Sequence, residues 1–137
     1  MTAPSKTGLV VVTHGTIGQA MIEVAEFILG QTLDDVRFVP FQQSSMAETG
    51  DAEILQAVRL ADQGQGVLVM TDICGASPYN TVAGNISRLG SEQNVVMTCG
   101  LNLAMLIRVW NYRDRPPADL AKLASDGAVR DIRECQS

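Results

Sequence analysis

The sequence predicts an α/β fold: a doubly wound, mostly parallel sheet of four strands with helices on both faces. Two observations lead to this prediction. Short apolar runs rich in β-branched residues alternate along the chain with longer segments of helical periodicity, a pattern typical of βαβ units. Two of the apolar runs also end alike, one at His14 and one at Asp72, and each is followed by a glycine-containing turn and a helical segment. Parallel strands would place both ends at one edge of the sheet.

Four segments are predicted to be strands. Residues 9–12 and 66–71 are continuous apolar runs, which are typical of strands covered on both faces. Residues 36–40 are less hydrophobic and are expected nearer an edge of the sheet, with Pro40 ending the strand. Residues 94–98 form the fourth strand.

The first helix is expected at residues 16–29, where apolar residues recur at helical spacing. The residues expected on its buried face are Ile17, Ala20, Met21, Val24 and Ile28. Gly30 follows where a left-handed C-cap belongs.

Further helices are expected at residues 51–63, 77–89, 99–110 and 118–125. Ser45-x-x-Glu48 matches a capping box that would start the first of these earlier, but Gly50 opposes that start. Ser77 is placed to cap the second, with Pro78 in its first turn. Gly127 is expected to end the last. Residues 128–135 stay open between helix and strand, and the spacing of Val129 and Ile132 favours a helix.

Composition limits the function classes. The chain has 137 residues, which suits one domain at residues 8–137 preceded by a polar leader at residues 1–7. A net charge of −5 without a Lys/Arg cluster argues against nucleic-acid binding. The three cysteines have neither metal-site nor disulfide-framework spacing, so no metal and no cofactor are expected. No apolar run approaches the ~20 residues of a membrane span, and the N-terminus lacks a signal-peptide core. We expect a cytoplasmic protein with no direct membrane insertion.

His14 is the main candidate for chemistry. It precedes a helix N-terminus, where backbone N–H groups and the helix dipole favour an anion, and the hydroxyls of Thr13, Thr16 and Ser77 are possible additional donors. A neutral imidazole that faces an anion site is suited to attack a phosphoryl group. On the residues alone, a histidine that only makes local hydrogen bonds remains an equal alternative.

Asp72 is the expected partner of His14. A carboxylate that accepts one imidazole N–H fixes the tautomer and stabilises positive charge on the ring, although an aspartate that caps a turn is the alternative. Ser77 has the same kind of alternative, as a helix N-cap. Asn80 and Asn102 are candidate phosphate or partner contacts, but each also suits a turn or a cap.

Three motifs occur in order along the chain: Gly8-Leu-Val-Val-Val-Thr-His14-Gly15, Thr71-Asp72-Ile-Cys-Gly75-Ala-Ser77-Pro-Tyr-Asn80 and Gly100-Leu-Asn102-Leu-Ala-Met-Leu106. Together they resemble the IIA component of the mannose family of the bacterial phosphoenolpyruvate-dependent sugar phosphotransferase system. The resemblance implies that His14 accepts a phosphoryl group from phospho-HPr and passes it to a histidine of a IIB component. It implies that Asp72 pairs with His14 and that the segment around Ser77 lines the phosphate site.

We therefore expect a phosphate site built from the two turns, with contacts from Thr13, Gly15, Thr16, Gly75 and Ser77. The resemblance also implies a homodimer in which a C-terminal strand, placed within residues 128–134, crosses antiparallel to the partner's sheet. The family commonly has a second glycine where this chain has Ala76, and no IIB domain follows in this sequence.

Two alternatives stay open. The phosphotransferase subunit that serves dihydroxyacetone kinase shares the histidine but usually has a different turn after the aspartate. A flavodoxin-like regulatory module that binds an anion or a protein would never form phosphohistidine. Whether a IIA protein of this kind feeds a transporter or acts as a regulatory signal is not decided by these residues.

Overall fold

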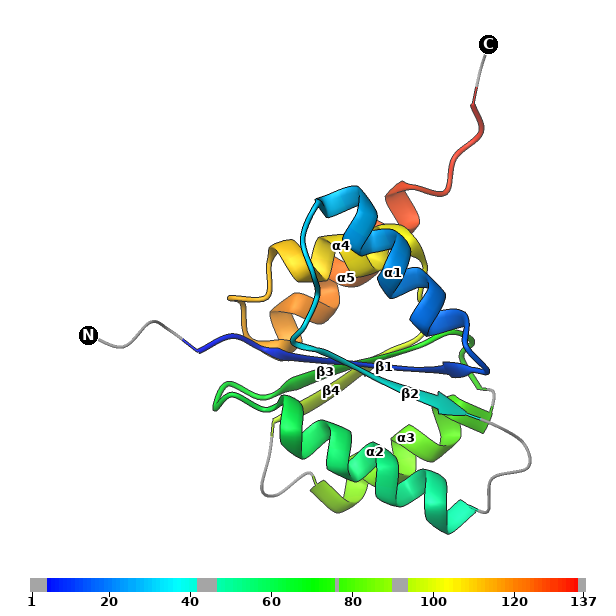
Figure 1. The fold of residues 1–137 in the computed structure, drawn as a ribbon, viewed down its shortest axis with the longest axis vertical. Helices are drawn as coiled ribbons and strands as arrows, with labels where there is room; N and C mark the ends of the chain where they lie inside the picture. The colour runs from blue at the N-terminus through cyan, green and yellow to red at the C-terminus, as the bar shows by residue number, and fades with distance from the viewer. Residues whose placement is uncertain (1–4, 42–46, 76, 90–93, 136–137) are drawn as a thin grey trace.

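The structure is a computed structural model that describes residues 5–41, 47–75, 77–89 and 94–135. Its centre is a parallel sheet of four strands in the order β2-β1-β3-β4 (Figure 1). The strands are β1 (Gly8–His14), β2 (Val36–Phe41), β3 (Val67–Thr71) and β4 (Val95–Thr98). The predicted parallel sheet is confirmed, and the two strands that end at the candidate residues are neighbours in it.

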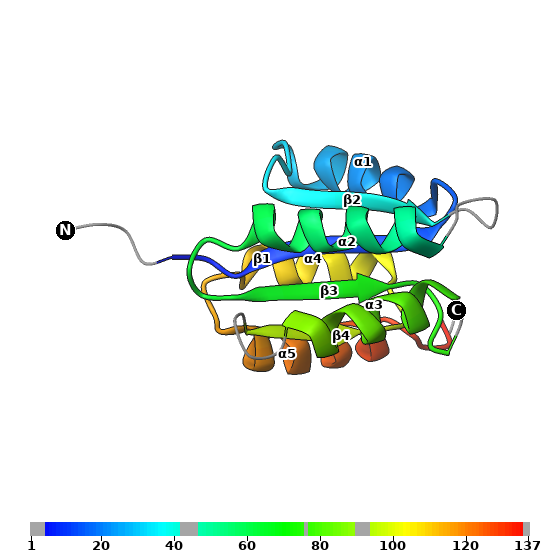
Figure 2. The same cartoon turned by 90° about the horizontal axis from the view of Figure 1, so that it is seen from below.

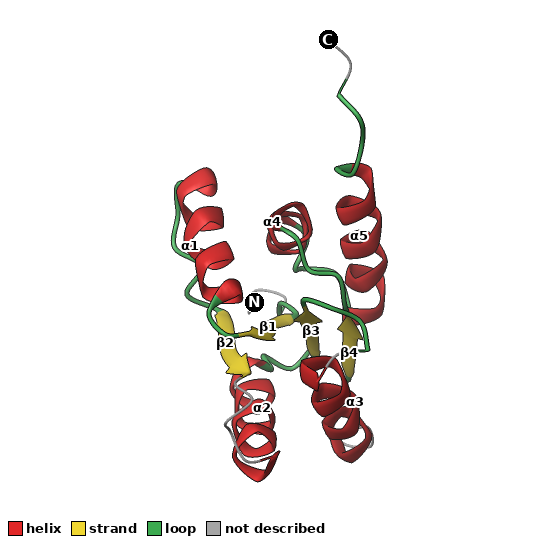
Figure 3. Cartoon of the chain, turned by 90° about the vertical axis from the view of Figure 1, so that its right-hand side faces the viewer, coloured by secondary structure: helices red, strands yellow, loops and turns green. Residues whose placement is uncertain are grey.

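Helices cover both faces of the sheet (Figure 3). One face carries α1 (Ile17–Leu29), α4 (Leu103–Asn111) and α5 (Pro117–Arg130). The other face carries α2 (Ala47–Ala61) and α3 (Ser77–Leu89), and Figure 2 views the sheet from this side. The doubly wound arrangement predicted from the alternation of elements is therefore confirmed.

The two apolar cores meet at the sheet. Leu9 and Val11 of β1 pack toward α1, α4 and α5, whereas Val10 and Val12 pack toward α2 and α3. All four are at most 1% exposed. β3 repeats this alternation, which explains why both strands are continuous apolar runs.

Two helix boundaries differ from the prediction at glycines. Helix α2 begins at Ala47 and continues through Gly50, and Ser45 of the expected capping box lies outside the described residues. Helix α5 continues through Gly127, where the Arg108 side chain of α4 occupies the position that a Cβ would take. A glycine inside a helix costs only about 1 kcal/mol, and at Gly127 the packing of α5 against α4 outweighs that cost.

The strand placed within residues 128–134 is wrong for its first part. Helix α5 runs to Arg130, as the spacing of Val129 and Ile132 favoured, and residues 132–135 form neither helix nor strand in the single chain. Val129 is 66% and Ile132 74% exposed. The end of the described chain therefore presents apolar side chains to solvent.

The buried face of α1 is also not the predicted one. Of the five predicted residues only Met21 is partly buried, and the following are exposed: Ile17, Ala20, Val24 and Ile28. The buried residues of this helix are Gly18, Ile22 and Ala25. Gly18 allows a close approach to the sheet, because a Cβ there would lie 2.7 Å from side-chain atoms of Phe38 and Val11. The larger apolar stripe of α1 is left on the surface.

At the edge of the sheet, β2 continues one residue past Pro40, which was predicted to end it, and ends at Phe41. Pro40 stands opposite Thr13 in the register with β1. A proline without an N–H donor is tolerated there because β2 has a neighbour on one side only.

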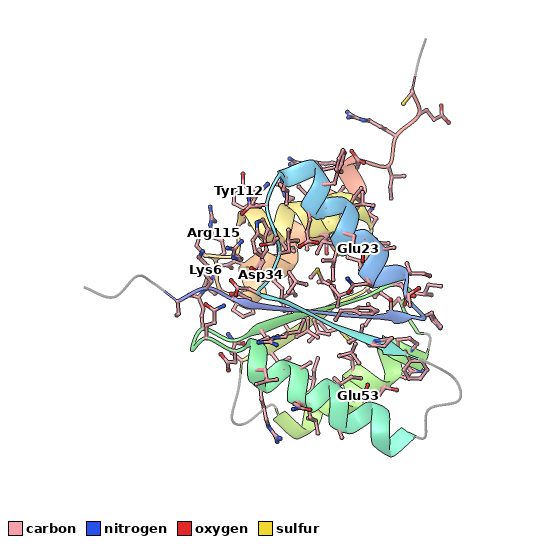
Figure 4. The ribbon with its side chains drawn as sticks, viewed as in Figure 1. Lys6, Glu23, Asp34, Glu53, Tyr112 and Arg115 are labelled. Carbon is pink, nitrogen blue, oxygen red and sulfur yellow. The ribbon has the colours of Figure 1, made fainter. Side chains whose placement is uncertain are left out.

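The opposite end of the sheet, where β1 begins, carries polar residues from several loops. Figure 4 shows Lys6, Asp34, Tyr112 and Arg115 close to this end. Thr7, which the sequence places in a polar leader, is 1% exposed, and its hydroxyl donates to the carbonyl oxygen of Arg115. The ordered fold therefore includes this residue. No helix within the described residues is both long and apolar enough to cross a membrane.

Candidate functional site

The candidate site lies at the carboxyl ends of β1 and β3. These strands are parallel neighbours with Val12 opposite Thr71, so His14 at the end of β1 and Asp72 just after β3 emerge at the same edge of the sheet. Gly15 then turns the chain with a φ of 49°, and its N–H donates to the carbonyl oxygen of Phe41 at 3.0 Å. The predicted meeting of the histidine and the aspartate is confirmed.

Asp72 holds His14 at two points. The carboxylate oxygen Oδ2 lies 2.9 Å from His14 Nδ1 and 3.0 Å from the His14 backbone nitrogen. The His14 side chain is 39% exposed, whereas that of Asp72 is 10% exposed. A carboxylate at this distance makes Nδ1 the protonated nitrogen of the neutral ring, which leaves the lone pair on Nε2.

The electrostatics keep Asp72 ionised. Burial by itself raises the pKa of this carboxyl group, but hydrogen bonds from the His14 backbone, the His14 ring and the Ile73 N–H, together with the charge of His14, bring the net pKa below its ordinary value. Ile73 N lies 2.9 Å from Asp72 Oδ1. Both carboxylate oxygens are therefore engaged, and the side chain is fixed in orientation.

The other residues predicted around His14 lie differently. Thr13 is fully buried, and its Oγ1 accepts from Gly18 N in α1 at 2.9 Å. We therefore leave Thr13 out of the phosphate site, because its hydroxyl stabilises the start of α1. Thr16 is exposed at the N-cap position of α1 and makes no capping hydrogen bond through its side chain. Its hydroxyl and Gly15 remain candidate contacts.

The turn after β3 brings a second set of candidates to the same edge. Gly75 is exposed with a φ of 80°, a conformation that favours glycine. Asn80 Nδ2 donates to the Gly75 carbonyl oxygen at 3.4 Å, which ties the turn to α3. Ser77 is the first residue of α3, but its side chain, like Ala76, lies outside the described part of the structure.

Asn102 has a structural role. It caps α4 by accepting from Met105 N at 2.8 Å, and its Nδ2 donates to the Ala128 carbonyl oxygen of α5 at 3.3 Å. The cap alternative stated for this residue is thus confirmed.

Phe41 is a neighbour of the site that the sequence did not reveal. Its ring packs edge-on to the His14 ring with the centroids 6.3 Å apart. The available signal was its place at the end of β2, directly opposite His14 in the register. Among the described residues, no group of three or more His, Cys, Asp or Glu side chains is arranged to hold a metal ion.

Fold and site together define a doubly wound α/β protein with a carboxylate-oriented histidine at the carboxyl edge of its sheet. A family model named EIIA-man, described as "PTS system fructose IIA component", matches residues 8–122. The chain belongs to this family, the mannose family of phosphotransferase-system IIA proteins.

Two curated relatives illustrate the relationship. The chain is 30% identical over 101 residues to the PTS system fructose-specific EIIA component of Bacillus subtilis, covering 74% of this chain and 66% of that protein. It is 26% identical over 110 residues to the mannose-specific EIIAB component of Escherichia coli K12, covering 80% of this chain. The chain spans only about a third (33%) of the length of that EIIAB protein.

Solved structures share the fold. The mannose/sorbose-specific IIA subunit from Enterococcus faecalis superposes with a TM-score of 0.83 at 20% identity, covering 97% of each chain. A IIA protein associated with the fucose utilization operon of Streptococcus pneumoniae gives a TM-score of 0.79 at 22% identity, covering 97% of this chain and 96% of the other.

Proposed function

We propose that the protein is a phosphocarrier that accepts a phosphoryl group on His14 from phospho-HPr. The observation that carries this proposal is the contact between Asp72 Oδ2 and His14 Nδ1. In the transfer, the Nε2 lone pair attacks the phosphorus, the N–P bond forms, and the bond from phosphorus to the donor breaks. The ring becomes positively charged, and the ionised Asp72 stabilises that charge.

The phosphate site is proposed at the two helix N-termini that flank His14. Helix α1 starts at Ile17, three residues after His14, and α3 starts at Ser77, five residues after Asp72. Such ends present backbone N–H groups and a partial positive charge to an anion. Gly15, Thr16, Gly75 and Ser77 are the contacts that we assign to the phosphoryl oxygens.

The acceptor is proposed to be a histidine of a IIB component, or else the phosphorylated form itself acts as a regulatory signal. Phosphohistidine suits both roles, because the N–P bond breaks readily and the phosphoryl group passes to a second nucleophile. Both donor and acceptor would reach His14 at the exposed edge of the sheet. We place this exchange in the cytoplasm.

We also propose that two copies form a homodimer by exchanging their C-terminal segments. β4 is an edge strand with all four residues partly exposed, and an unpaired edge is a template for another strand. Residues 132–135 are without regular structure in the single chain and include the exposed Ile132. Their pairing with β4 of a partner would complete that edge.

The test is transfer of labelled phosphate from phosphoenolpyruvate in the presence of enzyme I and HPr. Wild type is expected to carry a label that is lost in acid and kept in base, and His14→Ala is expected to carry none. Circular dichroism of His14→Ala supplies the folding control, since a half-exposed residue at the sheet edge is not needed for the core. A folded wild type that stays unlabelled would refute the phosphocarrier.

A further inference from the structure

Two cysteines lie beside the candidate site, in the neighbouring loops that follow β3 and β4. These strands are parallel neighbours with Met70 opposite Thr98. Cys99 directly follows Thr98, and Cys74 lies in the turn after β3. The two loops are joined by a hydrogen bond of 2.9 Å from Leu101 N to the Thr71 carbonyl oxygen.

The two thiols are not equivalent. Cys74 is exposed, whereas Cys99 is partly buried, and both are free cysteines. Burial, followed by a hydrogen bond to the Cys74 side chain and the charge of Cys74, raises the pKa of the Cys99 thiol to about 11. Cys99 therefore stays protonated at neutral pH, while Cys74 is the thiol that an oxidant in solution can reach.

We propose that Cys74 and Cys99 are an oxidation site that forms a reversible disulfide, with a hydroperoxide as the oxidant. The Cys74 thiolate attacks the terminal peroxide oxygen, the O–O bond breaks, and Cys74 becomes a sulfenic acid as the alcohol, or water from hydrogen peroxide, leaves. Cys99 sulfur then attacks the Cys74 sulfur and displaces hydroxide, which takes the Cys99 proton and leaves as water. Two thiols lose two hydrogens, and the hydroperoxide is reduced. A cellular dithiol reverses the bond by thiol–disulfide exchange.

The proposed bond would act on the site through the turn that holds Asp72. Cys74 is two residues from Asp72 and one residue from Gly75, and the Ile73 N–H between them is a hydrogen-bond donor to Asp72. A bridge to Cys99 ties this turn to the end of β4 and changes the position of its backbone. This consequence rests on the phosphocarrier proposal. A displacement of about 1 Å at a reacting group can cost about 100-fold in rate, so we expect phosphorylation of the oxidised form to slow by that order.

The first experiment measures the bond itself in the full chain. Wild type, Cys74→Ser, Cys99→Ser and the control Cys135→Ser are treated with hydrogen peroxide and analysed by thiol counting and non-reducing peptide mass spectrometry. Wild type and Cys135→Ser are expected to lose two thiols and to yield one peptide pair linked through Cys74 and Cys99, which a dithiol separates. The two single variants at the pair are expected to yield no such link. A link through Cys135, or separate oxidation of Cys74 and Cys99, would overturn the proposal.

The second experiment separates this proposal from the phosphocarrier. His14→Ala is expected to form the disulfide as readily as wild type, so the bond can be scored in a protein without the phosphoacceptor. Reduced wild type is expected to be labelled faster than the oxidised form, whereas Cys74→Ser, which lacks the thiol that the peroxide oxidises, is expected to be labelled equally before and after peroxide treatment. Equal labelling of reduced and oxidised wild type would overturn the effect on the site, and no labelling in either state would overturn the phosphocarrier instead.

Discussion

Asp72 Oδ2 accepts hydrogen bonds from two atoms of one residue, the backbone N–H and the ring Nδ1–H of His14. One contact fixes the end of β1 and the other fixes the imidazole, so a single carboxylate oxygen joins strand position to ring orientation. Ring rotation would break the second contact while the first still held the two strands together. The site is therefore organised before any phosphoryl donor arrives.

Replacement of Asp72 by Asn is expected to slow phosphorylation of His14 by about 100-fold or more, by analogy with other orienting carboxylates. An amide cannot offset the positive charge that develops on the ring. The rate of phosphohistidine formation, followed by rapid quench, checks this. Asp126→Asn on the exposed side of α5 is the charge-matched control, and equal rates for Asp72→Asn and wild type would remove Asp72 from the mechanism.

The stabilising effect of Asp72 is expected to depend on pH in one direction. Because its folded-state pKa is below the ordinary value of 3.8, the ionised form stabilises the fold above that value, and this stability is lost as the pH falls through the folded-state pKa. The difference in unfolding free energy between wild type and Asp72→Asn should therefore shrink as the pH falls below 3.8. Urea unfolding at a series of pH values measures it. A difference that does not shrink below pH 3.8 would contradict the assigned hydrogen bonds.

Gly18→Ala is expected to destabilise the protein by about 1–3 kcal/mol, the usual cost of overpacking. The new methyl group would lie 2.7 Å from side-chain atoms of Phe38 and Val11. Gly84→Ala is the matched control, because Gly84 is an exposed residue of α3 with open space at its Cβ position. That change should stabilise the protein by about 0.5–1 kcal/mol through helix propensity. Equal effects at the two glycines would show that α1 does not approach the sheet this closely.

The two apolar stripes of α1 can be compared by making the same isoleucine-to-alanine change in each. Ile22→Ala removes a side chain that is 6% exposed and should cost about 2–5 kcal/mol. Ile28→Ala removes one that is 54% exposed and should cost no more than about 1 kcal/mol. Denaturant unfolding of both variants at a concentration where the protein is monomeric measures the contrast. A reversed order would restore the buried face that the sequence predicted.

Removal of residues 132–137 is expected to convert the proposed homodimer into a monomer while the fold stays intact. The removed segment contributes no strand or helix to the single chain within its described part. Sedimentation equilibrium of the full chain and the truncated chain measures the association, and near-ultraviolet circular dichroism monitors packing around Trp110. A truncated chain that still dimerises would place the interface elsewhere.

Much of the fold was predictable because it depends on local patterns. The continuous apolar runs around Val10 and Val69 indicated strands that are covered by helices on both faces of the sheet. Because helices connect these strands in parallel, His14 and Asp72 come to the same edge. Tertiary packing decided what the patterns could not. Gly50 lies inside α2 and Gly127 inside α5, and at Gly127 the packing of α5 against α4 outweighs the small helix penalty of glycine.

The pairing of His14 with Asp72 could be predicted from the sequence. The positions of the residues around this pair were harder to predict. The burial of Thr13 could not be recognised from the sequence, because a threonine at the end of a strand can be either exposed or buried. The α1 prediction failed for a similar reason: this helix has two apolar stripes, and periodicity alone selects the larger one. Small residues, here Gly18 and Ala25, decided which stripe could approach the sheet.

Pro40 makes the two edge strands of the sheet differ in their ability to pair with a further strand. On β2 it removes one backbone donor from the edge strand, so this edge is a poor template for a further strand. The β4 edge, Val95–Thr98, contains no proline. A further strand is thus added more easily at the β4 border than at the β2 border, and the proposed exchange of C-terminal segments at that single border would close with two copies instead of extending into a filament.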